Sequence, residues 1–390
     1  MTTENISIYD NIPKIEQIVY DRLNCVICDK NKFTDVINIK NTINIISDIE
    51  YDNNEIKSLN FIGCENCGCV QLKNLFSQNL IYSQPLQIFD GPNIQKHHNS
   101  FCDFIINNIN YEKNLFEIGG AYGDLAKKII QKYADNGSYI KYKILEYNAE
   151  HYPEINNVEY ITGNCELYNY NGIKTIIMSH VFEHLYAPRI FLNKISATSI
   201  ENIFISIPDM DNLMINGDLN NLNILHTYYI NSQFIIYLFN LYGFNLEINE
   251  NLYNNSNFYY FKKNIKITTY GYDYKNLHLI NQIKLFYNNE IEKIEKIKIN
   301  KPFYICPSGF YGQFIYFNLN KETKLHLLGF LDSDKFKIDK RLNGTNLYNF
   351  KKDIIKNINE IYILISSVKH RYEIINELTK YNNNIIFINI

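Results

Sequence analysis

The 390-residue chain contains no tryptophan, only four arginines and no long apolar run free of charge. A membrane span needs about 18 or more such residues in succession, so none is expected. The N-terminus also lacks the basic and apolar regions of a secretory signal. The formal net charge of −3 provides no basic field for nucleic acid or an anionic membrane. We therefore expect a cytoplasmic protein with no nucleic-acid partner and no membrane span.

The chain is rich in tyrosine, phenylalanine and dispersed asparagine, with 33 Tyr and 24 Phe. Hydrophobic residues make up 46% and charged residues 20%, which excludes a disordered or collagen-like chain. At about 100–200 residues per domain, the length predicts two or three domains. Because Tyr and Asn are so frequent here, a lone Tyr or Asn carries little functional weight.

Four of the eight cysteines form two C-x2-C pairs, Cys25 with Cys28 and Cys64 with Cys67. Two such pairs offer four thiolates, the tetrahedral donor set that structural Zn²⁺ prefers. A closed four-thiolate shell leaves no open position, so the expected role is in folding. Buried or redox-active cysteines remain the alternative. The other four are expected to be small buried hydrophobes: Cys69, Cys102, Cys165 and Cys306.

A glycine-rich turn follows a short apolar strand in the segment NLFEIGGAYGD, residues 114–124. Glu117, Gly119 and Gly123 lie in this segment, and a helical pattern follows directly. Strand, glycine turn and helix together form the setting in which a ligand approaches the backbone and a helix N-terminus. A purely structural turn remains the alternative.

Polar residues end the next strands of the predicted α/β unit. Glu146 ends a second strand 23 residues after Gly123, where a carboxylate accepts hydrogen bonds from ribose hydroxyls. Asn164 follows a third strand. We expect its side chain to contact an adenine edge; a residue that only forms the turn is the alternative. Glu183 and His184 follow the fourth strand. Ligands of open α/β sheets bind at such carboxyl ends.

These motifs together resemble a class I S-adenosylmethionine-dependent methyltransferase over residues 100–265. The family's usual turn is E-x-G-x-G-x-G, and Ala121 takes the place of its middle glycine. The match argues against a dinucleotide dehydrogenase. The resemblance implies a Rossmann-like core that binds S-adenosylmethionine, with Gly119 and Gly123 near the methionine part. The cofactor residues that it implies are Glu117, Gly119, Gly123, Glu146, Asn164 and Ser179.

The flanking segments resemble the sugar C-methyltransferases, which have a zinc-binding domain in front and a Rossmann-like domain behind. The resemblance implies a zinc ribbon (1–76), a methyltransferase core (77–265) and a second α/β domain (301–390). Between the last two, the apolar spacing of residues 266–300 predicts a linking helix, with a membrane-surface helix as the alternative. Within the linking helix, four apolar residues recur at near-helical spacing: Ile280, Ile283, Leu285 and Ile291. In the last domain, Ser308 and Gly309 lie at the first turn, and Asp332 and Asp334 end the second strand.

The catalytic region departs from the sugar C-methyltransferases. Their Tyr-His-Glu-His stretch corresponds to Asn223-Ile-Leu225-His226 here, so the second His is kept and the Glu is lost. Carbon methylation requires an enolate, whereas a hydroxyl requires one base. A histidine suits that task. We therefore expect His226 to be the general base, with His184 as second choice; a packed or loop-orienting histidine is the alternative for each.

The predicted function is methyl transfer from S-adenosylmethionine to a hydroxyl of a nucleotide-linked sugar in polysaccharide or natural-product biosynthesis. Tyr82 and Tyr229 are expected to contact this small-molecule substrate. Carbon methylation of a keto-deoxysugar nucleotide is one alternative. A non-catalytic cofactor-binding or assembly partner is another, against which the cofactor residues argue. His97 and His98 are expected to be surface residues.

Overall fold

The computed structural model describes most of the chain, which divides into two compact units. Unit 1 comprises Met1–Thr34, Gly63–Asn212 and Leu225–Leu277, and unit 2 comprises Asp35–Ile62, Leu213–Ile224 and His278–Ile390. The predicted strand end at Asp334 lies outside the described residues. These are 19–40, 58–82, 92–109, 112–215, 222–252, 256–264, 276–333, 337–338, 341–342, 345–350, 360–368 and 370–389.

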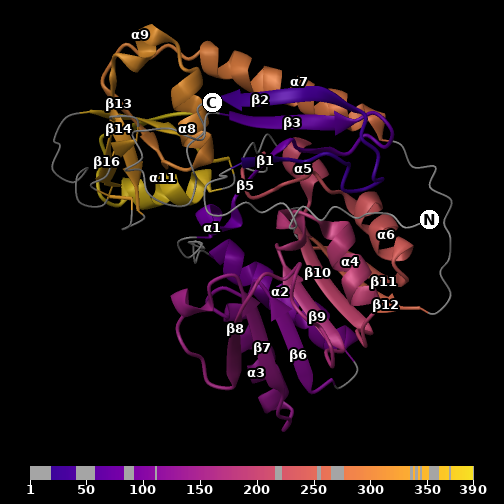
Figure 1. Cartoon of the computed structure of the whole chain (residues 1–390). Coiled ribbons are helices and arrows are strands. Elements are labelled where there is room, and N and C mark those ends of the chain that lie inside the picture. The colour runs from indigo at the N-terminus through magenta and orange to yellow at the C-terminus, as the bar shows by residue number, and fades with distance from the viewer. Residues whose placement is uncertain are drawn as a thin grey trace. The chain divides into compact units, whose positions relative to one another are not determined.

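The main sheet of unit 1 has seven strands in the order β11-β12-β10-β9-β6-β7-β8 (Figure 1). Its five parallel strands follow the third-second-first-fourth-fifth order of a Rossmann sheet. Strand β12 is antiparallel to its neighbours β10 and β11. The strands are β6 (Asn114–Ile118), β7 (Lys141–Glu146), β8 (Val158–Thr162), β9 (Thr175–Ser179), β10 (Asn202–Pro208), β11 (Phe244–Leu252) and β12 (Ser256–Lys263).

Helix α3 (Asp124–Asp135) of unit 1 buries one apolar face. Its residues Leu125, Ile129 and Tyr133 recur every four residues and are buried. Strand β6 and helix α3 share one core cluster with α2, which contributes Phe101 and Phe104. The helices are α1 (Gln78–Ile81), α2 (Pro92–Asn108), α3, α4 (Pro188–Ser196), α5 (Met210–Ile215) and α6 (Ser232–Leu241), with short 3-10 turns η1 (Ala149–His151) and η2 (Phe182–His184).

Short strands surround the two cysteine pairs. Strand β1 (Val19–Asp21) pairs antiparallel with β5 (Asn74–Phe76). Strands β2 (Phe33–Lys40) and β3 (Ser58–Cys64) are neighbours in one sheet and flank residues 41–57, which lie outside the described part. Strand β4 (Val70–Leu72) follows the second cysteine pair. The paired strands and the cysteine turns fit the predicted zinc ribbon.

Unit 2 contains a second parallel sheet, in the order β15-β16-β14-β13-β17-β18. Its parallel strands again follow the third-second-first-fourth-fifth order, and β15 is antiparallel at the edge. Both sheets confirm the predicted α/β class. The strands are β13 (Phe303–Cys306), β14 (Leu327–Asp332), β15 (Arg341–Leu342), β16 (Thr345–Asn349), β17 (Ile361–Ile365) and β18 (Ile385–Ile388).

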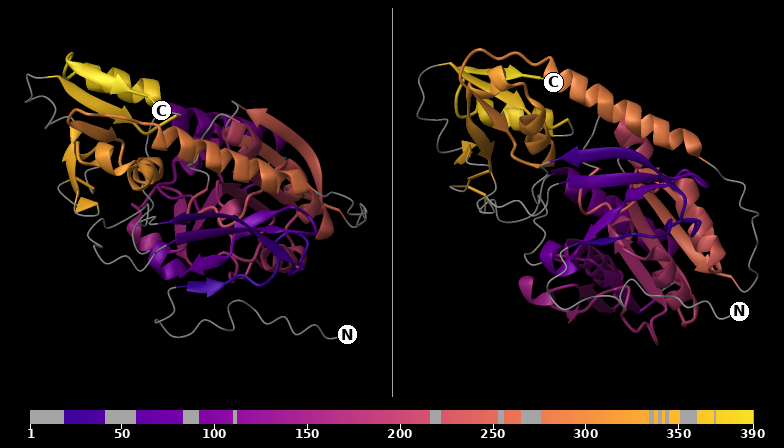
Figure 2. Two further views of the ribbon diagram at one scale, coloured as in Figure 1. Left: turned by 90° about the horizontal axis from the view of Figure 1, so that it is seen from above. Right: turned by 45° about the horizontal axis from the view of Figure 1, so that its top comes forward.

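Helix α7 (Leu277–Glu295), visible as one long helix in Figure 2, lies within the segment where the spacing predicts a helix. Ile280 and Ile283 are buried as the spacing predicts, whereas Leu285 is exposed. Within unit 2, the hydroxyl of Tyr287 donates to the carbonyl of Asn38 at 3.2 Å. The remaining described helices of unit 2 are α8 (Phe310–Asn318), α9 (Lys321–Lys324) and α11 (Arg371–Thr379). Among the described residues, no helix is long and apolar enough to cross a membrane.

Candidate functional site

The carboxyl ends of β6, β7 and β9 meet at one edge of the unit 1 sheet. Ile118 is in register with Leu145 of β7 and with Met178 of β9. The next residues along these three strands are Gly119, Glu146 and Ser179, so the fold brings three predicted cofactor residues to the same level. Such an edge, outside the ends of parallel strands, is where open α/β sheets hold ligands.

The turn after β6 has no room for side chains at its two predicted glycines. Gly119 has φ +72°, and a Cβ there would lie 2.4 Å from Cγ2 of Val181. Gly123 has φ +66°, and a Cβ there would lie 2.4 Å from Cδ1 of Ile155. Left-handed backbone of this kind is favourable mainly for glycine. Ala121 also lies in the left-handed region, at φ 45°, where a glycine would be free of strain.

Glu146 is linked directly to this turn. Its Oε1 accepts a hydrogen bond from the backbone N–H of Ala121. The hydroxyl of Tyr160 donates to the carbonyl of the same Ala121 at 2.8 Å. Burial raises the pKa of Glu146 to about 7, partly opposed by the backbone N–H groups of Ala121 and Tyr147. The side chain is therefore a hydrogen-bond acceptor held at the edge where the turn begins.

Glu117 lies under the turn within the sheet. It is 1% exposed, and the hydroxyl of Tyr142 donates to its Oε2 at 2.9 Å. Burial raises the pKa of Glu117 to about 8, although the Tyr142 hydrogen bond opposes the rise. A Cβ on Gly120 would lie 2.9 Å from its carboxyl carbon, so this glycine lets the turn lie flat on Glu117. Its predicted contact with the cofactor stays a prediction.

Asn164 and Ser179 bond to neighbouring protein groups. The side-chain oxygen of Asn164 accepts from the N–H of Glu166 at 2.8 Å, and its amide nitrogen donates to Oε1 of Gln78 at 2.8 Å. Ser179 Oγ lies 3.2 Å from Nε2 of His97. The expectation that His97 is a surface residue holds only in part, because its side chain is half-buried and its ring lies 4.7 Å from that of His180. The cofactor roles of Asn164 and Ser179 stay predictions.

Glu183, His184 and His226 form a second cluster in unit 1. Glu183 and His184 lie in η2, directly after β9, and His226 comes from a distant part of the chain. The rings of His184 and His226 are stacked with centroids 5.3 Å apart. Burial lowers the pKa of His184 to about 4, although Glu183 opposes the change. Burial alone would raise the pKa of Glu183, but the neighbouring histidines lower it below its usual value.

Backbone and side-chain hydrogen bonds hold the segment that follows His226. The N–H of Thr227 donates to the carbonyl of Glu183 at 3.1 Å. The Thr227 hydroxyl donates to the carbonyl of Leu185 at 2.7 Å, and the Tyr228 hydroxyl to that of Phe182 at 2.5 Å. Three bonds thus fix the segment to η2 and its flanks, and they explain why the two histidines meet.

A buried arginine that the sequence did not single out joins the same segment to the cysteine region. Arg22 is 6% exposed; its guanidinium donates to the carbonyls of Thr227 at 2.6 Å and Tyr186 at 2.9 Å. Strand β4 bonds to the segment as well, because Leu72 N–H donates to the Thr227 carbonyl at 2.9 Å. The ribbon residues therefore help to position His226. No local sequence pattern distinguishes Arg22, because its partners lie far away along the chain.

The two tyrosines predicted to contact substrate are both in enclosed surroundings. The Tyr82 ring lies 5.3 Å from the ring of Tyr147, and burial raises the pKa of Tyr82. Tyr229 is 2% exposed, and its hydroxyl donates to Oδ1 of Asp211 at 3.1 Å. Burial raises the pKa of Tyr229, with Asp211 adding to the rise. Their contact with substrate stays a prediction.

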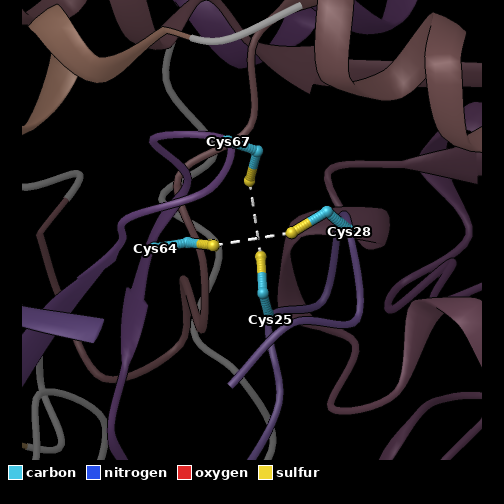
Figure 3. Close-up of side chains that lie close together, drawn as sticks. All are labelled: Cys25, Cys28, Cys64 and Cys67. Carbon is cyan, nitrogen blue, oxygen red and sulfur yellow. Dashed lines mark hydrogen bonds between the residues drawn. The ribbon is translucent and has the colours of Figure 1, made fainter. Parts of the chain in front are cut away.

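The sulfurs of the two cysteine pairs point toward one centre (Figure 3). Cys25 Sγ lies 3.6 Å from Cys67 Sγ, and Cys28 Sγ lies 3.5 Å from Cys64 Sγ. A tetrahedral zinc with Zn–S bonds of about 2.3 Å separates its sulfurs by about 3.8 Å, so the four thiolates fit this ion. Hydrogen bonds with the other three sulfurs raise the pKa of the Cys67 thiol, and burial adds to the rise.

Local turns preorganise the cysteines. Asp29 N–H donates to the Cys25 carbonyl at 2.9 Å, and Gly68 N–H donates to the Cys64 carbonyl at 2.8 Å. Gly68 has φ +83°, and a Cβ there would lie 2.1 Å from the carbonyl oxygen of Asn276. Each pair thus spans a tight turn that directs both sulfurs inward. The spare Cys69 is buried beside the second pair.

No family model and no curated protein matches this sequence. Solved structures that are similar to it include magnesium protoporphyrin IX methyltransferase from Synechocystis PCC 6803 with bound S-adenosylhomocysteine. That match has 12% identity and a TM-score of 0.34, and covers 44% of this chain and 83% of the other.

Two further solved structures are similar to the chain. Human N-acetylserotonin methyltransferase in complex with S-adenosylmethionine has 14% identity and a TM-score of 0.36, covering 44% of this chain and 54% of the other. A Burkholderia thailandensis 1,6-didemethyltoxoflavin N1-methyltransferase with bound S-adenosylhomocysteine has 7% identity and a TM-score of 0.34, covering 44% and 80%. Each match covers less than half of this chain.

Proposed function

We propose that unit 1 contains an S-adenosylmethionine-dependent methyltransferase core. The observation that carries this proposal is the bond from the Ala121 N–H to Glu146 at the carboxyl edge of the sheet. Glu146 is an acceptor suited to ribose hydroxyls, and it lies beside a turn whose left-handed glycines let the backbone bend tightly at the strand end. The Rossmann strand order and the nearby pair of histidines support the same proposal.

The acceptor in this proposal is a hydroxyl of a nucleotide-linked sugar, and His226 is the base. His226 takes the hydroxyl proton while the oxygen attacks the methyl carbon. The new O–C bond forms as the S–C bond breaks, and the sulfonium leaves as a neutral thioether. The low pKa of His184 keeps that ring neutral, so it is able to accept or donate a hydrogen bond to the sugar.

Leu225 favours oxygen over carbon as the acceptor atom. It stands where the sugar C-methyltransferases have a glutamate, and a leucine is unable to assist in forming an enolate. Glu183 is a carboxylate near His226, which keeps carbon methylation as a second candidate. A ¹³C NMR spectrum of product made with ¹³C-methyl donor separates the two, because an O-methyl carbon is far more deshielded.

The remaining parts of the chain have supporting roles in this proposal. The four cysteines hold a structural Zn²⁺, whose ribbon positions the segment of His226 through Arg22 and β4. The domain boundaries proposed from sequence are 1–76, 77–265, 266–300 and 301–390. A cytoplasmic location and a role in polysaccharide or natural-product biosynthesis are part of the same proposal.

Two measurements test the proposal in sequence. Calorimetry with S-adenosylhomocysteine is expected to show binding to the full chain; no binding would favour the non-catalytic alternative. Methyl transfer to nucleotide-linked sugars is then expected to fall by roughly 10²–10⁴-fold in His226→Ala, since that is the range for a general base. His278→Ala, at an exposed histidine of α7, is the control and retains activity. Near-normal turnover in His226→Ala would remove it from this role.

A further inference from the structure

The cluster of Glu183, His184 and His226 has the donor set of a metal site. One ligand atom from each residue lies within 4.8 Å of the other two. Two imidazoles and one carboxylate are the ligands that divalent transition metals use when they keep coordination positions open. The four-cysteine group is a different candidate metal site and shares no residue with this cluster.

Glu183 supplies the observation that points to a ligand. Its side chain is fully buried, and neither of its carboxylate oxygens has a hydrogen-bond partner in the described residues. A buried ionised carboxylate without partners costs several kcal/mol, so it is expected to have a counter-charge. The nearest cation candidate is His180, whose Nδ1 lies 3.5 Å from Oε1 of Glu183. This distance exceeds that of a good hydrogen bond.

His180 is already engaged on its other side. Its Nε2 lies 3.1 Å from Oγ of Ser256. His180 also adopts φ 53°, an uncommon conformation for a residue other than glycine. Ligand atoms of the two stacked histidines lie within 4.8 Å of the Glu183 carboxylate, so an ion among them would meet three ligands at once.

We propose that Glu183, His184 and His226 bind one divalent transition-metal ion. The ligand atoms now lie within 4.8 Å of one another. A tetrahedral ion about 2.0–2.1 Å from each donor would place the donors about 3.4 Å apart, so the ligand atoms have to move closer together. The proposal therefore requires the half-buried histidine side chains to rotate toward Glu183 when the ion binds. Three protein ligands leave at least one coordination position for an oxygen ligand, such as a hydroxyl.

The binding of the ion stands on this geometry, whereas its use in methyl transfer rests on the proposed function. With the ion bound, the ring nitrogen of His226 is a ligand instead of a base. The acceptor hydroxyl then binds the ion, loses its proton to water and attacks the methyl carbon as before. The two versions predict opposite effects of removing the ion: loss of turnover if it activates the hydroxyl, and no loss if His226 acts as a free base.

The test is a Co²⁺ titration of the full chain that already carries one zinc per molecule in its cysteine site. We expect a second metal equivalent with visible absorption bands but no thiolate charge-transfer band. Glu183→Gln and His226→Ala are each expected to lose it, with affinity falling by at least about 100-fold, since loss of outer-shell partners alone costs 10–100-fold. His278→Ala is the matched control and keeps it.

Zinc content is the folding control, because a variant that retains one zinc has an intact cysteine site. If Glu183→Gln does not retain its zinc, His226→Ala alone decides the result. The proposal is overturned if the parent chain binds no second equivalent, or if His226→Ala binds it as tightly as the parent. Calorimetry with S-adenosylhomocysteine on the same samples reports separately on the proposed function.

Discussion

The two Rossmann-type sheets of this chain have the same strand order but differ at their first turn. In unit 1, the turn after β6 contains two glycines with left-handed φ, where a Cβ would collide with a neighbour. In unit 2, the turn after β13 begins with Pro307 and Ser308, and Gly309 has an ordinary φ of −63°. A Cβ on Gly309 would meet nothing within 4 Å. Gly309 is therefore not required for backbone reasons, whereas Gly312, in the first turn of α8, has no room for a Cβ, which would lie 2.3 Å from the Pro307 carbonyl oxygen.

The acidic residues that end the second strand of each sheet, Glu146 and Asp332, also differ in their hydrogen-bond partners. Glu146 accepts the backbone N–H of Ala121. Asp332 accepts both the N–H and the hydroxyl of Ser308, at 3.1 and 2.5 Å, and lies 3.3 Å from Nζ of Lys337. The chain itself thus supplies Asp332 with donors and a counter-charge. Equal strand order does not imply equal ligand chemistry, because the turn decides which acceptors remain for a ligand.

The largest expected difference between the two turns comes from adding one methyl group to each. Gly119→Ala places a Cβ 2.4 Å from Val181 in left-handed backbone, so we expect a loss of about 3 kcal/mol in the free energy of unfolding. Binding of S-adenosylhomocysteine should weaken at least about tenfold. Gly309→Ala is the control and should change stability by less than about 0.5 kcal/mol. Urea unfolding and calorimetry measure both, and equal losses in the two variants would remove the contrast.

A smaller difference should appear in the pH dependence of stability. The folded-state pKa of Glu117 is about 8 against an ordinary value of 4.5, so the folded state binds the extra proton between these values. The stability contributed by this proton is complete below about pH 4.5 and declines as the pH rises toward 8, by up to about 1.4 kcal/mol per pH unit. Strand β13 ends in Cys306 and has no such carboxyl.

Glu117→Gln isolates this effect, because the amide does not titrate and its oxygen still accepts the Tyr142 hydroxyl. As the pH rises from 5 to 8, the free energy of unfolding of the parent should fall relative to that of the variant. A difference that stays constant over this range would show that Glu117 does not carry a raised pKa.

The smallest effect is expected at Ala121, where the unit 1 turn departs from the E-x-G-x-G-x-G pattern. Ala121→Gly removes the left-handed strain of an L-residue, worth about 1–2 kcal/mol, but increases the entropy of the unfolded chain by about 0.4–1 kcal/mol. The net change should be a gain of less than about 1.5 kcal/mol, with binding of S-adenosylhomocysteine within about threefold. A loss of stability would show that the Ala121 methyl packs usefully.

Local patterns explain which features were predictable from the sequence. The glycine turn, Glu146 and the cysteine pairs each rest on residue type at a fixed spacing. Arg22 has no such pattern, since its partners Thr227 and Tyr186 lie more than 160 residues away. The same holds for His97, whose contact with Ser179 joins the ends of two distant elements. Spacing along the chain reports on turns and helices, whereas these contacts depend on packing.

The sequence by itself determined the α/β class, the strand-turn-helix around Gly119 and the four thiolates of the ribbon. These follow from short-range rules: short apolar strands followed by helical patterns, glycine at positive φ and two cysteines on one tight turn. Only the tertiary structure decided that Glu183, His184 and His226 meet. It also decided that Arg22 and β4 both bond to Thr227, in the segment that follows His226. The physical reason is that hydrogen bonds and burial act between neighbours in space, which the order of residues does not specify.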